Sequence, residues 1–228
     1  MALRPITDGL WAFETEIRVS AGFYLPLRST LVRLEGGALA LVSPIRLSDE
    51  EAAEVDALGT VEHLVAPNLW HHLFLRAASA RWPAAKVWGP RALAKKRPDL
   101  RFDGVLEEAR RIGGALRVLP IEGLAKVGEC ALLHEPSRSL LLTDTVFNVT
   151  EPRPGLTSLI LRLVGAHRKL AMSRAERFMC NDRAKLAASS RAILDAGFDR
   201  LVPAHGDVID SGAQPQLEEA WAWALAGG

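Results

Sequence analysis

Residues Leu64 to His72 read LVAPNLWHH, and this stretch decides how the rest of the sequence is interpreted. It begins as an apolar run of strand length, is interrupted by Pro67 and Asn68, and then carries two adjacent histidines. In a regular strand the side chains of His71 and His72 would point to opposite faces. The two imidazoles can share one metal ion only if the proline and the asparagine take the backbone out of strand geometry.

Two further apolar runs end on a residue of a metal-binding type. LLLTD ends at Asp144, and LVPAH ends at His205, directly before Gly206. Open α/β proteins place their sites at strand ends, so these side chains are expected to lie near the paired histidines. A single histidine or aspartate after a strand is more often a cap or a satisfied buried group. The repetition at three strand ends is what favours a functional site.

The length and the charge of the chain limit its domain count and its partners. At 228 residues the sequence suits a single domain spanning residues 1–228. The 28 lysines and arginines nearly balance the 27 aspartates and glutamates, so no overall field favours nucleic acid or an anionic membrane. We expect a small-molecule substrate or ligand as the partner, with no nucleic acid and no membrane. The sequence leaves the oligomeric state open.

The cysteines and the apolar segments predict a soluble, cytoplasmic protein. Cys130 and Cys180 are far apart and match no zinc-knuckle or redox spacing, which favours two reduced thiols. The first residues, MALRPITDGLW, contain no apolar stretch of signal-peptide length. The most apolar later segment, Leu156 to Ala166, is too short to span a bilayer and contains Arg162.

Short apolar runs alternate with charged helical stretches, which predicts a layered α/β protein. The expected strands are Leu10–Phe13, Thr30–Leu34, Ala38–Val42, His63–Ala66, Lys86–Trp88, Ala115–Leu119, Cys130–His134, Ser139–Thr143 and Arg200–Val202. Tight turns are expected at Gly36-Gly37 and at Glu135 to Arg138. One expected helix begins after the N-cap Ser48 and stops at Gly59. The other expected helices cover Leu73–Ala80, Pro90–Lys95, Ser173–Ala196 and Gln214–Ala226.

The segment of about 148–180 fits this alternation least well. It is a loop punctuated by prolines, followed by helical and partly basic sequence. A helical lid over the strand ends and an ordinary pair of surface helices explain it equally well.

These motifs resemble those of the metallo-β-lactamase-fold hydrolase superfamily, and the resemblance runs over almost the whole chain. The H-x-H-x-D-H loop of that family falls on Pro67 to His72, so its first two ligand positions read Pro67 and Leu69. The aspartate position reads His71, and only the final histidine is kept. The family's Gly-Asp is similar to Thr143-Asp144, and its Pro-x-His-Gly is similar to the segment that ends at Gly206.

The resemblance implies a four-layer αββα sandwich, in a bacterial branch whose metal loop is degenerate. The family's third histidine would fall near Ala125, where the sequence has no histidine. All three ligands of one metal position are therefore missing. The four positions of the other are occupied by residue types that bind metals: His71, His72, Asp144 and His205. We expect one divalent metal there, with Zn²⁺ as the first choice and Fe²⁺ or Mn²⁺ as alternatives. A metal-free cluster of hydrogen-bonded polar groups is the competing interpretation.

Other polar residues are weaker candidates. His63, His134 and His167 are interpreted as structural or surface residues. Glu122 or Glu129 could approach the vacated metal position as a base or an extra ligand. The sequence contains no phosphate-binding G-x-x-x-x-G-K-[ST] loop, no G-x-G-x-x-G after a strand and no G-x-S-x-G elbow.

The leading functional hypothesis is a mononuclear metal-dependent hydrolase of an ester, thioester, lactone or phosphoester. Four protein ligands would fill a tetrahedral zinc site, whereas a catalytic site keeps one position for water. The alternative is therefore a catalytically degenerate metal-binding scaffold, which binds a small molecule or a protein without turnover. A third hypothesis is O₂ chemistry on an iron with open positions.

Overall fold

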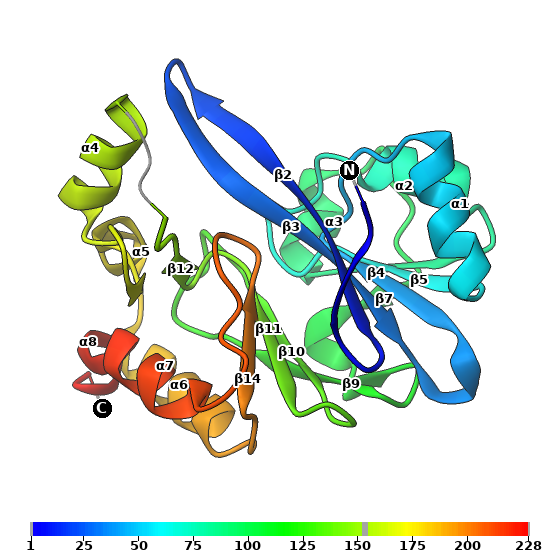
Figure 1. Cartoon of the computed structure of the whole chain (residues 1–228). Helices are drawn as coiled ribbons and strands as arrows, with labels where there is room; N and C mark the ends of the chain where they lie inside the picture. Colours follow the sequence, from blue (N-terminus) through cyan, green and yellow to red (C-terminus); the bar gives the residue numbers. More distant parts are fainter. Residues whose placement is uncertain (1, 152–154, 228) are drawn as a thin grey trace.

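The computed structural model describes residues 2–151 and 155–227. Two β-sheets pack face to face and carry helices on their outer faces (Figure 1). The seven-stranded sheet runs in chain order through β1 Arg4–Thr7, β2 Leu10–Ser20, β3 Phe23–Arg33, β4 Leu39–Val42, β5 Val61–Val65, β6 Lys86–Gly89 and β7 Gly104–Val105. The five-stranded sheet has the order β14 Arg200–Pro203, β11 Ser139–Leu142, β10 Cys130–His134, β9 Leu116–Pro120 and β8 Arg111–Ile112.

Three apolar cores separate the four layers. The core between the sheets joins side chains of both, such as Val42 and Val65 with Leu132 and Val202. The helices α1 Asp49–Leu58, α2 Leu75–Arg81 and α3 Arg91–Lys96 share a second core with the outer face of the seven-stranded sheet. On the other side, α6 Arg183–Leu194, α7 Ala213–Ala220 and α8 Ala222–Leu225 share a third core with the five-stranded sheet. The predicted four-layer αββα sandwich is confirmed.

The predicted strands are all present, but β2 and β3 are much longer than expected. Each has 11 residues, whereas the sequence indicated only the apolar ends. Beyond Phe13 the strand continues as a polar alternation in which Glu14 pairs across the ladder with Arg28 at 2.6 Å. Charged side chains on one face hid the strand period, because the expectation rested on apolar runs.

Two predicted helices are each divided in two, which corrects the expected bounds. The stretch predicted as one helix from Ser173 to Ala196 forms α5 Arg174–Met179 and α6. It breaks because Asp182 is an N-cap whose side chain accepts the N–H of Lys185. The last predicted helix forms α7 and α8, which meet at Trp221.

The described part of the segment predicted as a lid or helix pair contains α4 Gly155–Val164, β13 Leu170–Ala171 and α5. Strand β13 pairs with β12 Phe147–Asn148. Helix α4 packs against β3, where the backbone N–H of Tyr24 donates to Thr157 Oγ1 at 3.1 Å. Residues 152–154 lie outside the described part. Among the described residues, no helix combines the length and the apolar character needed to cross a membrane.

Candidate metal centre

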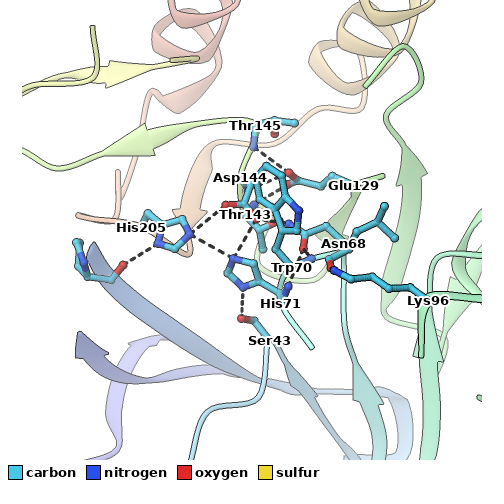
Figure 2. A network of polar contacts seen from close by, with 12 residues as sticks. Ser43, Asn68, Trp70, His71, Lys96, Glu129, Thr143, Asp144, Thr145 and His205 are labelled. Carbon is cyan, nitrogen blue, oxygen red and sulfur yellow. Dashed lines mark hydrogen bonds and ion pairs between the residues drawn. The ribbon is translucent and has the colours of Figure 1, made fainter. Parts of the chain in front are cut away.

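Three loops that follow strands deliver the polar side chains to one edge between the two sheets. The loop after β5 carries His71, the residues after β11 include Asp144, and His205 follows β14. Strands β11 and β14 are parallel neighbours, with Leu142 paired to Pro203, so their carboxyl ends lie side by side. Figure 2 shows the three side chains pointing toward one another.

The ligand atoms of these three residues lie close together. His71 Nε2 lies 3.2 Å from Asp144 Oδ2, and His205 Nε2 lies 3.3 Å from Asp144 Oδ1. The two Nε2 atoms are 3.2 Å apart. Ligands held tetrahedrally about 2.0 Å from a zinc ion are separated by about 3.3 Å, so these spacings suit two imidazoles and a carboxylate around one ion. The two rings face different oxygens of Asp144. Among the described residues, His71, Asp144 and His205 are the histidine, cysteine and acidic side chains that come close enough, as a group of three, to share one ion.

Hydrogen bonds on the far side of each ring fix the imidazoles. His205 Nδ1 lies 2.7 Å from the carbonyl oxygen of Pro26, to which it donates, and His71 Nδ1 contacts Ser43 Oγ. In neutral His205 the proton is then on Nδ1, which leaves the Nε2 lone pair directed at His71 Nε2. Ser43 Oγ can donate to or accept from His71 Nδ1, so His71 Nε2 either carries a proton that bonds to His205 and Asp144 or presents a second lone pair to a cation. Metal-binding histidines show this outer hydrogen bond as a rule.

Asn68 connects the histidine loop to Asp144. Its Nδ2 donates to an oxygen of Asp144 and, at 2.8 Å, to Thr143 Oγ1. Its Oδ1 accepts the backbone N–H groups of Trp70 and His71 at 2.7 and 2.8 Å. The sequence indicated Asn68 only as a strand breaker. A side chain that satisfies both segments at once could not be recognised from the sequence.

Glu129 holds the backbone of the segment that carries Asp144, and its side chain is not part of the candidate site. Its two oxygens accept the backbone N–H groups of Thr143, Asp144 and Thr145 at 2.6, 2.9 and 2.8 Å. Burial raises the pKa of Glu129 to about 7. The prediction of Glu129 as a base or an extra ligand is therefore wrong, because both oxygens are occupied by backbone. Glu122 is exposed to solvent.

The buried charges depend on one another. Burial alone would raise the pKa of Asp144, but the charges and hydrogen bonds of His71 and His205 lower it. Burial alone would lower the pKa of His205, whereas its hydrogen bond to Asp144 raises it. An ionised carboxylate beside two imidazoles is the state that attracts a cation.

His72 is not part of the cluster, which corrects the four-ligand prediction. Its Nδ1 lies 2.7 Å from Arg97 Nη1 and accepts a hydrogen bond from it. Burial and the charges of Lys96 and Arg97 lower the pKa of His72, so the neutral ring acts as an acceptor. Although the backbone leaves strand geometry, as the paired histidines required, it does not turn both rings to the same side. Three of the four predicted ligands therefore converge.

Pro67 and Leu69, at the vacated ligand positions, bond through their backbone to residues 127–130. The carbonyl of Pro67 accepts the N–H of Cys130 at 2.9 Å, and the N–H of Leu69 donates to Val127 at 3.0 Å. Ala125, where the resemblance places the missing third histidine, is exposed.

A pocket of about 270 Å³ opens onto the three converging residues. Ile17, Val19, Leu25 and Leu27 of the long hairpin line one side of it. No described residue of the segment 148–180 lines this pocket. A larger, polar cavity of about 360 Å³ lies around Arg28 and contains none of the three ligands.

Comparison with solved structures identifies the fold. A structure described as the DIM-1 metallo-β-lactamase exposed to ceftazidime is 12% identical, covers 100% of this chain and 97% of its own, and has a TM-score of 0.67. A metallo-β-lactamase from Pontibacter korlensis is 14% identical, covers 98% of each chain and also reaches 0.67. The chain has the metallo-β-lactamase fold.

Three further comparisons complete this result. The metallo-β-lactamase FIM-1 from Pseudomonas aeruginosa, in its mono-zinc form, is 11% identical, covers 99% of this chain and 93% of its own, and has a TM-score of 0.61. A family described as a domain of unknown function, DUF4336, matches residues 7–92. No curated protein matches the chain. At such low identities the likeness to metallo-β-lactamase structures shows the fold alone.

Proposed function

We propose that this protein is a mononuclear metal-dependent hydrolase in which His71, Asp144 and His205 hold one divalent ion. The observation that carries the proposal is the convergence of the two Nε2 atoms, 3.2 Å apart, on the carboxylate of Asp144 at 3.2 and 3.3 Å, at the floor of a pocket. Three protein ligands leave a tetrahedral ion one position for water or substrate, which is typical of catalytic zinc sites. The loss of His72 from the set therefore favours catalysis over a closed structural site.

The chain's own residues supply position and charge. A divalent ion bound there would lower the pKa of a water molecule and polarise the scissile bond. Pro26 and Ser43 orient the two rings. Asn68 donates to the carboxylate of Asp144, and Glu129 accepts the backbone N–H of the same residue. Such outer contacts preserve the ligand geometry.

Two features support the choice of a single metal. The first metal position of the family lacks all its ligands here. In addition, a solved structure with the same fold, FIM-1, is described in a mono-zinc form. Zinc suits two imidazoles and a carboxylate, although the same donor set serves Fe²⁺ oxygenases, so the identity of the metal has to be measured. With reduced cysteines and no spanning helix among the described residues, we propose the cytoplasm as the place of action.

A catalytically degenerate scaffold is the second candidate, because half of the two-metal constellation has been lost. Such a protein would bind one ion and a ligand in the same pocket but would turn nothing over. Activity therefore separates the two candidates, while metal content tests what they share.

The first experiment measures metal content by elemental analysis. Wild type and His72→Ala are expected to hold about one ion per chain, whereas His205→Ala should hold none. His72→Ala is the matched control, since His72 is also a buried histidine of the same region but bonds to Arg97. A content near two, or loss of the ion in the His72 variant, would contradict the proposed site.

The second experiment measures hydrolysis of simple ester, thioester, lactone and phosphodiester substrates. We expect activity that chelation and Asp144→Ala both abolish. Metal binding without any turnover would favour the scaffold, and turnover unaffected by chelation would refute a metal-dependent hydrolase.

A further inference from the structure

The pocket above the three ligands is apolar on all sides except its floor. Besides the hairpin side chains, Trp70, Leu73, Phe74 and Phe147 line it. Its titratable lining consists of His71, Asp144 and His205 alone among the described residues, with no lysine or arginine. A ligand whose polar group is held at the floor would therefore have the rest of its atoms surrounded by apolar side chains.

Three cations close to pocket-lining residues in the chain are directed elsewhere. Lys96 Nζ donates to the carbonyl oxygen of Leu69 at 2.7 Å, and Arg97 pairs with Asp99 at 2.8 Å. Arg28 pairs with Glu14 beside the other cavity. A carboxylate or phosphate remote from the floor would be desolvated here without a partner, which is costly.

The mouth of the pocket exposes apolar side chains that nothing in the described chain covers. Leu73 is 59% exposed, Val19 is 54% exposed and Trp70 is 37% exposed. Large apolar side chains gathered at the rim of a pocket are typical of a surface that receives an apolar ligand.

We propose that the substrates are neutral carboxylic esters, thioesters or lactones whose acyl group is an apolar chain of medium length. This inference rests on the proposed function and excludes phosphoesters and substrates with a second, anionic group. Since a water molecule occupies about 30 Å³ of liquid, the pocket has room for roughly nine atoms of that size. An octanoyl group fits this space, whereas an acetyl group leaves most of it unfilled and a palmitoyl group exceeds it.

The proposed reaction is hydrolysis, with water as the second reactant. The oxygen of the water forms a bond to the acyl carbon, and the bond from that carbon to the alkoxy oxygen or thiol sulfur breaks. A proton from the water goes to the leaving group, which gives an alcohol or thiol and a carboxylic acid. The acid then ionises by giving its proton to solvent.

The kinetic test compares the p-nitrophenyl esters of acetate, octanoate and palmitate, with the hemisuccinate as the anionic ester. We expect kcat/KM for octanoate to exceed the value for each of the others by at least about tenfold, because burial of each methylene is favourable. Leu73→Ser should lower the octanoate value at least about fivefold, and should lower the ratio of the octanoate value to the acetate value. Leu163→Ser is the matched control, because Leu163 is 62% exposed and lies outside the pocket.

A binding test separates failure of this inference from failure of the proposed function. Calorimetry measures the binding of octanamide, acetamide and octanoate to wild type and to His205→Ala. The measurement on His205→Ala is made without metal. Octanamide should bind both proteins. On His205→Ala the affinity for octanoate should be at least about tenfold weaker than that for octanamide, and binding of acetamide should be undetectable. Octanamide binding without ester turnover would refute the hydrolase and leave the neutral, apolar ligand class standing. Equal binding of octanamide and octanoate by His205→Ala, or equal rates for acetate and octanoate esters, would overturn the inference.

Discussion

Asn68 is the residue that the tertiary structure turns from a strand breaker into a structural part of the candidate site. It bonds both to the histidine loop and to Asp144, which is 76 residues away in the sequence. The sequence identified His71, Asp144 and His205 because each follows an apolar run. It could not identify Asn68 or Glu129 as their supports, because those contacts run between distant segments. It also could not tell His71 from His72, since the direction of a ring in a turn depends on what packs around it.

Removing the Asn68 side chain should weaken metal binding. Asn68→Ala leaves Asp144 without one hydrogen-bond donor and frees the loop that carries His71, so we expect an affinity loss of roughly 10- to 100-fold. Competition with a chromophoric chelator measures it. Asn181→Ala is the control, because Asn181 bonds to the backbone of Ala125 instead. An affinity within about twofold of wild type would contradict the supporting role.

His134, which lies outside the candidate metal centre, should make the stability of the protein depend on pH. It is 2% exposed, with Nε2 at 3.1 Å from the carbonyl oxygen of Arg33 and Nδ1 at 2.6 Å from Ser137 Oγ. The neutral ring suits both contacts, and burial lowers its pKa. The unfolded chain therefore takes up this proton first, so the free energy of unfolding should fall as the pH drops below about 6.5.

Urea unfolding at pH 7 and pH 5 measures this effect. His134→Gln keeps a donor for Arg33 but cannot be protonated, so it should show a smaller decrease than wild type. An equal decrease in both proteins would assign the pH dependence to other groups.

At the scale of elements, local signals were sufficient where they were strong. Helix α1 begins and ends as predicted, because Ser48 and Glu51 form a reciprocal capping box and Gly59 follows the last turn. The break at Asp182 was missed because an N-cap within helical sequence resembles an ordinary helical residue. The length of β2 was missed because its outer half alternates polar and apolar residues.

The capping box should contribute measurably to stability. Ser48→Ala removes the acceptor for the N–H of Glu51, so we expect the free energy of unfolding to fall by about 1 kcal/mol. Ser79→Ala is the control, because Ser79 lies within α2 and donates only to the carbonyl oxygen of Leu75. Equal effects of the two substitutions would show that the cap contributes nothing specific.

At the scale of the whole molecule, the candidate site joins the two sheets. His71 follows β5 of the seven-stranded sheet, whereas Asp144 and His205 follow β11 and β14 of the five-stranded sheet. An ion bound by all three residues would therefore link the halves of the sandwich. Its binding energy adds to the stability of the folded state alone, since the unfolded chain does not hold the ligands together.

Metal should accordingly raise the temperature of unfolding. At a free metal concentration about 100 times its dissociation constant, the stabilisation should reach about 2.7 kcal/mol. Differential scanning calorimetry with and without a chelator measures it, with His205→Ala as the variant that no longer responds. The same shift in that variant would place the metal elsewhere.

The sequence by itself determined the layered α/β class, nine of the fourteen strands in the described part of the chain and the three residues that converge at the candidate site. It did so because strand ends, caps and turns are set by neighbours in the chain. Only the tertiary structure decided which of two adjacent histidines faces Asp144, which buried groups support it and how apolar the pocket is. Those properties arise where segments far apart in the sequence meet, and the packing of each side chain there depends on all the others.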